Sequence, residues 1–375
     1  MTIFPPITPA IRRAHHRPHL DHAAFFLANG VLVLIICAGS SSASAHEAWL
    51  LTPAEVAELA RQPLPTLFTA PGPLALAAFA SSAALLTAVA LETRLSRWET
   101  RLSAPLLILS PSLGPLLIRL GLAAMMALGA LGGLPRHGTA PWSEPTLFVP
   151  DMQLALVPGW DWLAPTQFVL ALLLGLGVQT RLSASAVLCL SLAGLVAFGQ
   201  PFLSYAPHFA APALVLLALG GGPWSVDRFW HRRAEPAIDP RTRDTSFLAA
   251  RVLLGLGFVY LAIAHKFTQP TLLMAIFEHG EIPTFGLPLD LIALAAACVE
   301  LIVGLLLVFG RLVRPTALLL IGLFTFFAVT LGETPLFHAN LYALAAMLVM
   351  TGPTPVGMPR RQAVPKTPEP LGDRS

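Results

Sequence analysis

The sequence predicts an all-α, polytopic integral membrane protein built from tandem four-helix bundles plus one extra transmembrane helix. Of the 375 residues, 55% are hydrophobic and only 11% are Asp, Glu, Lys or Arg. Soluble proteins carry about a quarter charged residues, so this chain lacks the polar side chains that a water-exposed surface needs. The other two observations are a series of apolar segments of spanning length and an internal repeat. Together they exclude a soluble enzyme, a disordered protein and a partner of nucleic acid.

The N-terminal segment, residues 1–45, has the pattern of an export signal. Arginines precede an apolar run of about fifteen residues, and a tract of Ser and Ala follows it. This order of basic region, apolar core and small residues predicts a cleaved signal peptide, with an uncleaved membrane anchor as the alternative. Cleavage at the end of the tract would make His46 the first residue of a periplasmic segment, residues 46–67.

Nine further apolar segments are long enough to be membrane spans in a bundle with short turns. They lie near residues 68–91, 104–134, 164–179, 184–200, 207–222, 247–265, 289–309, 313–331 and 337–351. Fifteen Lys and Arg residues fall in the connections and the tail on one side, against three on the other, namely Arg61, Arg136 and Lys266. Since positive charge accumulates on the cytoplasmic side, the mature N-terminus is expected in the periplasm and the C-terminus in the cytoplasm. The signal and this topology suit a bacterial inner (plasma) membrane.

The chain repeats itself at an offset near 133 residues. Arg119 corresponds to Arg251 near the start of an apolar helix, and Gln167 corresponds to Glu300 inside a later one. The other aligned pairs are Gly177 with Gly310, Arg181 with Arg314, Ala184 with Ala317 and His208 with His338. Polar and Gly matches at a nearly constant offset indicate two tandem units. The second unit keeps the ionisable groups, so chemistry is expected there.

The repeat and the spans divide the chain into consecutive parts. After the N-terminal segments come an extra transmembrane helix with a cytoplasmic loop (68–103), a degenerate four-helix unit (104–222), a basic cytoplasmic linker (223–245), a second four-helix unit (246–352) and a disordered cytoplasmic tail (353–375).

The second unit resembles the DoxX family of small four-helix membrane proteins. The residues that carry the resemblance are Arg251 in the first helix, Lys266 at its far end, and the run Val-Glu-Leu-Ile-Val-Gly-Leu-Leu-Leu at 299–307, which ends near Gly310. The resemblance covers about 105 residues well, and residues 104–222 weakly.

The resemblance implies a four-helix fold and an association with oxidoreductases. Some members of the family are subunits of a thiosulfate:quinone oxidoreductase, others are partners of enzymes that handle thiols or superoxide, and many have no assigned activity. The resemblance therefore implies a quinone as the candidate cofactor. The candidate partner is a soluble or membrane-bound redox protein, beside the lipid bilayer itself. It leaves open whether the chain is an enzyme.

Glu300, Lys266 and Arg251 are the candidate catalytic residues. Glu300 lies about ten residues into its helix, hence about 15 Å deep, where an acid costs about 2.5–3.5 kcal/mol on insertion scales. It should therefore have a partner or be protonated. It is read either as a proton-accepting group or as a structural hydrogen-bonding acid. Lys266 lies about 15 Å away in depth by the same arithmetic, so a direct pair with Glu300 is not expected without a tilted helix or an intervening water molecule. Tyr260 and Arg251 are the alternative partners.

Further polar residues are candidates for cofactor binding near the outer ends of the helices. They are Tyr260, His265, Glu333 and His338. Histidine with carboxylate can bind zinc or copper, although the spacings match no metal signature. The alternative is a set of interfacial residues that meet headgroups and water.

Three functions remain open at this point. The first is a redox-associated membrane subunit that faces a quinone, and the second is a non-catalytic membrane anchor or assembly protein. The third is a periplasm-facing copper-binding protein, because an N-terminal His46 would offer an α-amine and an imidazole to Cu(II).

Overall fold

The computed structural model describes residues 50–134, 140, 142–231, 239–332 and 334–353. The predicted signal segment, His46, Glu333 and the predicted tail from residue 354 onward lie outside the described residues. Within them the regular structure is helical, apart from one isolated β-bridge between Thr146 and Gln153. The predicted all-α fold class is confirmed.

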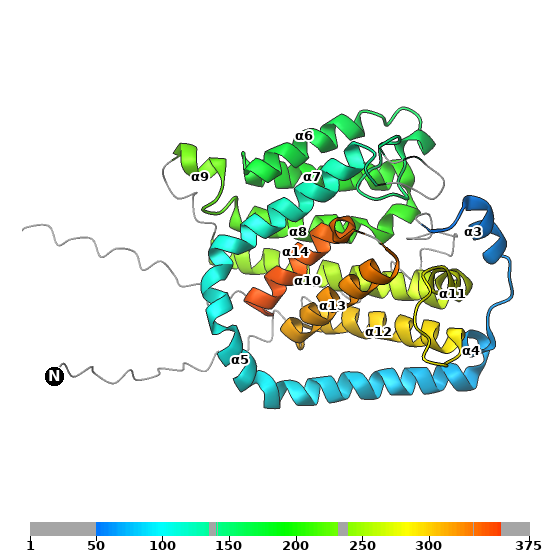
Figure 1. Cartoon of the computed structure of the whole chain (residues 1–375). Coiled ribbons are helices and arrows are strands. Elements are labelled where there is room, and N and C mark those ends of the chain that lie inside the picture. The colour runs from blue at the N-terminus through cyan, green and yellow to red at the C-terminus, as the bar shows by residue number, and fades with distance from the viewer. Residues whose placement is uncertain (1–49, 135–139, 141, 232–238, 333, 354–375) are drawn as a thin grey trace, which may run out of the picture. The chain divides into compact units, whose positions relative to one another are not determined.

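Figure 1 shows the arrangement of these helices. The α-helices are α3 (Pro53–Leu59), α4 (Thr66–Thr69), α5 (Pro71–Ala130), α6 (Leu163–Leu176), α7 (Thr180–Phe198), α8 (Ala206–Leu219), α9 (Val226–His231), α10 (Pro240–Leu261), α11 (Pro270–His279), α12 (Leu289–Phe309), α13 (Val313–Thr330) and α14 (Ala339–Thr351). Shorter turns are η1 (Leu154–Leu156), η2 (Gln200–Ser204), η3 (Ala262–Phe267) and η4 (Pro335–His338), of which η3 is a π-helix.

Six helical stretches in the described part are long and apolar enough to cross a membrane. They are Pro71–Leu95, Ser103–Ala130, Thr180–Phe198, Arg241–Phe267, Leu289–Phe309 and Val313–Thr330. Three shorter apolar helices, Leu163–Leu176, Ala206–Leu219 and Pro335–Thr351, match the remaining predicted segments. The chain is therefore a multi-pass membrane protein.

Helix α5 differs from the prediction, because the stretch expected to be a loop before residue 103 is helical. The whole helix has 60 residues, so a straight one would be about 90 Å long, three times the hydrocarbon core of a bilayer. It bends instead between its two apolar parts (Figure 1). Residues 92–103 contain no Gly or Pro and are rich in Glu, Arg and Leu, which are strong helix formers. The first span thus continues into the second without a break in the helix.

Two ion pairs join the bend of α5 to the connection between α12 and α13 and to the first turn of α13. Glu92 accepts from Arg311 at 3.1 Å, and Glu99 accepts from Arg314 at 2.9 Å. These residues lie at the end of the bundle that carries most of the arginines, here called the arginine-rich end. The opposite end is called the arginine-poor end.

The two halves pack against each other through equivalent helices. The most extensive helix pairs among the described residues are α5 with α14 and α10 with α8. In each pair, the first helix of one predicted unit packs on the last helix of the other. Within each unit the first helix also packs on the second, and the third on the fourth. This correspondence supports the inferred duplication.

The second helix of each unit ends in the same way. Gly177 after α6 and Gly310 after α12 are both left-handed, with φ of 71° and 67°. Buried Arg119 lies against Gly177, and buried Arg251 lies against Gly310. Arg251 Nη1 donates to the carbonyl of Leu307 at 2.6 Å, so this arginine satisfies a free carbonyl at the helix C-terminus.

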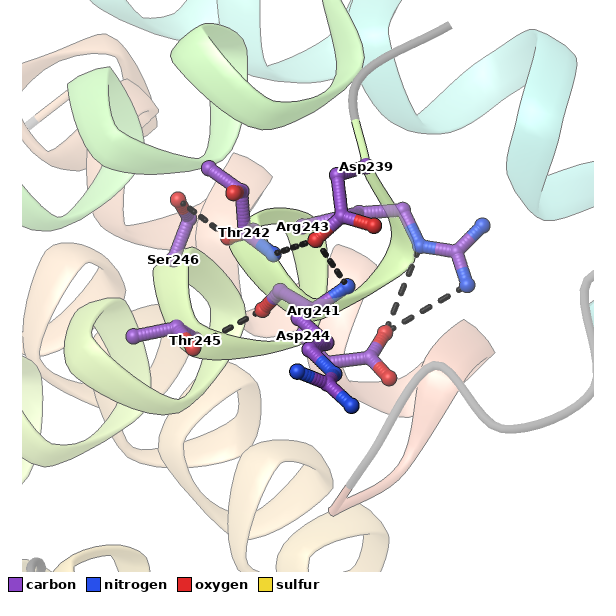
Figure 2. A network of polar contacts seen from close by, with 7 residues as sticks. All are labelled: Asp239, Arg241, Thr242, Arg243, Asp244, Thr245 and Ser246. Atoms are coloured by element: carbon purple, nitrogen blue, oxygen red, sulfur yellow. Dashed lines mark hydrogen bonds and ion pairs between the residues drawn. The ribbon is translucent and has the colours of Figure 1, made fainter.

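Helix α10 begins at the arginine-rich end with a capping network, shown in Figure 2. The Asp239 carboxylate accepts from the backbone N–H of Arg241 at 3.1 Å and of Thr242 at 3.4 Å. The Arg243 side chain pairs with the neighbouring Asp244 at 3.3 Å. An acidic cap satisfies amide groups that the first helical turn leaves unpaired, so the helix begins at Pro240 inside the predicted linker.

Candidate functional site

A cavity of about 290 Å³ lies within the bundle toward the arginine-poor end. Its walls come from α8, α10, η3, α11, α12, α13, η4 and α14, and Leu50 also lines it. Most of the lining is aliphatic or aromatic. The polar residues are His208, His265, Lys266, Gln269, Glu300 and His338. Small-molecule sites measure about 300–1,000 Å³ and combine apolar walls with a few converging polar groups, and this cavity fits that description at the small end.

Lys266 and Glu300 form an ion pair in this cavity. Lys266 Nζ lies 2.7 Å from Glu300 Oε2, and the two side chains are 28% and 14% exposed. The expectation that these residues are too far apart in depth was wrong. An acid inside an apolar helix needs a partner, and here the lysine is that partner.

The crossing of α10 and α12 explains the error. The two helices touch at Gly255 and Gly304, where a Cβ on either glycine would lie 2.7 Å from the other's carbonyl oxygen. Lys266 is eleven residues beyond Gly255, and Glu300 is four residues from Gly304 in the same direction. At 1.5 Å per residue the difference in depth is about 10 Å, which two long side chains can bridge. The expected depth of Glu300 is counted from the start of α12. This helix begins further from the crossing point than Lys266 lies, so the count overestimates the separation of the two side chains.

The π-helix η3 carries two of the polar residues into the cavity. His265 and Lys266 lie in this wider turn, which directly follows α10. Isolated π turns inside helices are frequent at functional sites. His265 Nε2 lies 2.9 Å from the hydroxyl of Ser204, and its ring packs edge-on to Tyr260 with centroids 5.7 Å apart. The contact with Ser204 ties the second unit's histidine to a turn of the first.

Two more histidines come from the fourth helices of the two units. His208 lies in the first turn of α8, and His338 directly precedes α14. The His338 ring stacks on Phe324 with centroids 5.6 Å apart, and the His208 ring packs on Phe258 at 5.4 Å. The pairing of α8 with α10 thus brings a first-unit histidine into a cavity made mainly by the second unit.

Two buried polar atoms of the lining have no hydrogen-bond partner among the described residues. They are His208 Nε2 and Gln269 Oε1. Leaving such a group unsatisfied costs about 1–3 kcal/mol, so buried polar atoms usually meet a protein group, a water molecule or a ligand. The cavity therefore holds groups that a polar ligand or water would satisfy.

Part of this site lies in a segment of the chain that matches a known family. Residues 246–334 match the family model of DoxX. This DoxX segment runs from α10 through α13, so it contains Lys266 and Glu300 but neither His208 nor His338. A search of curated proteins gives no match, and a search of solved structures gives none either.

The other candidate residues lie in different surroundings. Arg251 belongs to the DoxX segment but lies in the middle of α10, where it contacts Gly310 and Leu307 at the C-terminal end of α12 and does not line the cavity. Tyr260 lies behind His265 and does not line the cavity. Glu333 and His46 are outside the described residues. Among those that are described, no cluster of three or more His, Cys, Asp or Glu side chains is suited to a metal ion.

His208 and Gln269 line the cavity, although neither is among the candidate residues predicted from the sequence. His208 was aligned with His338, and this alignment was the signal that pointed to it. The first unit lacks the acids of the second, so its own sequence gives no reason to expect a site at His208. The contribution of His208 depends on packing between the units rather than on its own unit.

Gln167 shows what the first unit does with the position equivalent to Glu300 of the DoxX segment. This side chain is fully buried, and its Nε2 donates to the carbonyls of Met126 at 2.8 Å and Thr146 at 3.1 Å. Its Oε1 accepts from the N–H of Phe148 at 3.0 Å. Gln167 thus links the loop that contains Thr146 and Phe148 to α5 by hydrogen bonds to the backbone. Glu300, in contrast, lines a cavity beside a lysine.

Proposed function

We propose that the chain is a redox-associated membrane protein that binds a quinone, or a molecule of quinone-like chemistry, in the 290 Å³ cavity. The observation that carries the proposal is the pairing of Lys266 with Glu300 inside a largely apolar, membrane-embedded cavity. A purely structural pair would need neither the cavity nor the unpartnered polar atoms beside it.

The residues present fit such a ligand. A quinone head is a flat ring with carbonyl oxygens that accept hydrogen bonds. Phe258, Phe324 and Phe327 offer aromatic walls. A lysine ammonium has three donors, so Lys266 retains donors beyond the one directed at Glu300. When bound, a quinone supplies two-electron, two-proton chemistry, with electrons exchanged with a partner oxidoreductase of the kind that the DoxX resemblance implies.

The side chains of the cavity have separate roles in this proposal. Glu300 holds or accepts a proton, because a carboxylate beside a reacting oxygen is a general acid–base group. Lys266 keeps Glu300 oriented and donates to the ligand. His265, held by Ser204 at 2.9 Å, is a second donor or acceptor at the edge of the cavity.

The test is the binding of a short-chain ubiquinone to the purified full chain, measured by isothermal titration calorimetry in detergent. We expect Glu300→Gln to weaken binding about tenfold, or about 1.4 kcal/mol, because the ion pair that orients Lys266 is lost. Glu278→Gln is the matched control, since Glu278 is an exposed acid on neighbouring α11 that does not line the cavity. Its affinity should equal that of the unchanged protein.

Two results would contradict the proposal. One is the absence of ubiquinone binding to a folded, unchanged protein, which would favour the anchor or assembly role. The other is equal affinity for both Gln variants, which would place the ligand away from Glu300.

A further inference from the structure

A second cavity, of about 50 Å³, adjoins the first and belongs mostly to the first unit. Its polar lining consists of Asp151, Tyr205, His208, His338 and Asn340. His208, His338 and Leu341 line both cavities. The two histidines therefore lie where the small cavity meets the large one.

The polar side chains of the small cavity follow one another inward. Asp151 lies in the connection between α5 and α6 at the arginine-poor end and is partly exposed. The Tyr205 hydroxyl donates a hydrogen bond to Asp151 Oδ2, and Tyr205 is only 1% exposed. His208 is three residues further along, in the first turn of α8, and both side chains line the small cavity. Asp151, Tyr205 and His208 thus lead from the surface to the large cavity.

The small cavity has room for water. A water molecule needs about 10–15 Å³, so a cavity of about 50 Å³ has room for at least one. Water needs polar partners, and His208 Nε2 is a buried polar atom without a hydrogen-bond partner among the described residues. Room, polar lining and an unsatisfied atom occur at the same place.

We propose that Asp151, Tyr205, His208 and His338 line a water-filled path by which protons pass between the arginine-poor face and the large cavity. The path gives Glu300, which lines the large cavity, an exchange route to water at the arginine-poor face. Imidazole can take up a proton on one ring nitrogen and release it from the other, which suits histidines at the junction. The use of the path rests on the proposed function, whereas its hydration does not.

This path is not a property of the DoxX segment alone. Its four residues all lie outside residues 246–334, and three of them belong to the first unit. The first unit lacks an acid at the position of Glu300. In this proposal it instead supplies a route for protons to the large cavity of the second unit.

The test is hydroxyl-radical footprinting of the full chain without added quinone, because radicals formed from bound water label the side chains that touch it. Tyr205, His208 and the control Phe247 are buried to 1%, 4% and 5% exposure, and Phe247 lines neither cavity. We expect Tyr205 and His208 to be labelled at least about fivefold faster than Phe247. Labelling of all three at one rate would overturn the proposal.

A pair of variants tests the entrance. Asp151→Leu puts an apolar side chain at the mouth of the path and should reduce the labelling of His208 to that of Phe247. Asp161→Leu changes an exposed acid of the same connection that lines neither cavity, and should leave the labelling unchanged. Undiminished labelling of His208 in Asp151→Leu would contradict Asp151 as the entrance of the path. If that variant does not fold, the labelling rates of Tyr205 and His208 in the unchanged chain still test the path. Fast labelling of Tyr205 and His208 without ubiquinone binding would support the hydrated path and contradict the proposed ligand. Ubiquinone binding without fast labelling would support the ligand and contradict the path.

Discussion

Replacing Lys266 by methionine is expected to destabilise the protein by about 2 kcal/mol. The change leaves Glu300, whose side chain is 14% exposed, without the cation 2.7 Å away. Breaking a fully buried ion pair costs about 3–5 kcal/mol and an exposed one at most about 1 kcal/mol, and this pair lies between the two. The free energy of unfolding of the full chain, measured by denaturant titration in detergent, checks the value.

A double-mutant cycle separates the pair from other effects of the substitution. Adding Glu300→Gln to Lys266→Met removes the uncompensated charge and should recover most of the lost stability. Arg311→Met is the comparison, because Arg311 pairs with Glu92 in a more exposed setting, at 46% and 20% exposure. It should cost about 1 kcal/mol or less. A coupling free energy below about 0.5 kcal/mol between Lys266 and Glu300 would contradict the ion pair.

Replacing Gly310 by alanine is expected to cost about 3 kcal/mol. Gly310 has a φ of 67°, which is about 1 kcal/mol less favourable for a residue with a Cβ. The added methyl group would also lie 2.2 Å from Arg251 Nη1. That guanidinium is buried and hydrogen-bonded to Leu307, so it cannot move aside cheaply. Unfolding measured under the same conditions gives the loss.

Gly332→Ala is the matched control for the backbone term. Gly332 also has a φ of 67°, but among the described residues no atom beyond its chain neighbours lies within 4 Å of the position that its Cβ would take. It should cost about 1 kcal/mol, and the difference from Gly310→Ala measures the clash with Arg251. Equal losses for the two variants would show that Arg251 does not support this helix end.

The repeat places Arg251 and Arg119 at equivalent positions of the two units. Arg119 contacts Gly177 as Arg251 contacts Gly310, although the first unit has Gln167 in place of the acid. A residue that both units retain, and that does the same work in each, stabilises the fold. The ionisable groups that differ between the units, Lys266 and Glu300, line the cavity instead.

Composition and periodicity sufficed for the membrane class, the helical series and the position of most turns. These properties follow from local rules: an apolar stretch must form a helix in lipid, and a Gly ends it where the chain turns left-handed. Even so, local reading missed the continuity of α5, because charged residues between two spans resemble a loop although they favour a helix. The two acids of this bend, Glu92 and Glu99, pair with Arg311 and Arg314 of the second unit.

Contact between residues far apart in the chain could not be read from local patterns. The depth of Lys266 relative to Glu300 depends on where Gly255 and Gly304 cross, and His208 enters the cavity because α8 of one half packs on α10 of the other. Helix crossings are set by the shapes of facing surfaces, which a single segment does not encode. The amino-acid order therefore specifies which groups this membrane protein carries, and the packing of its two halves specifies which of them meet.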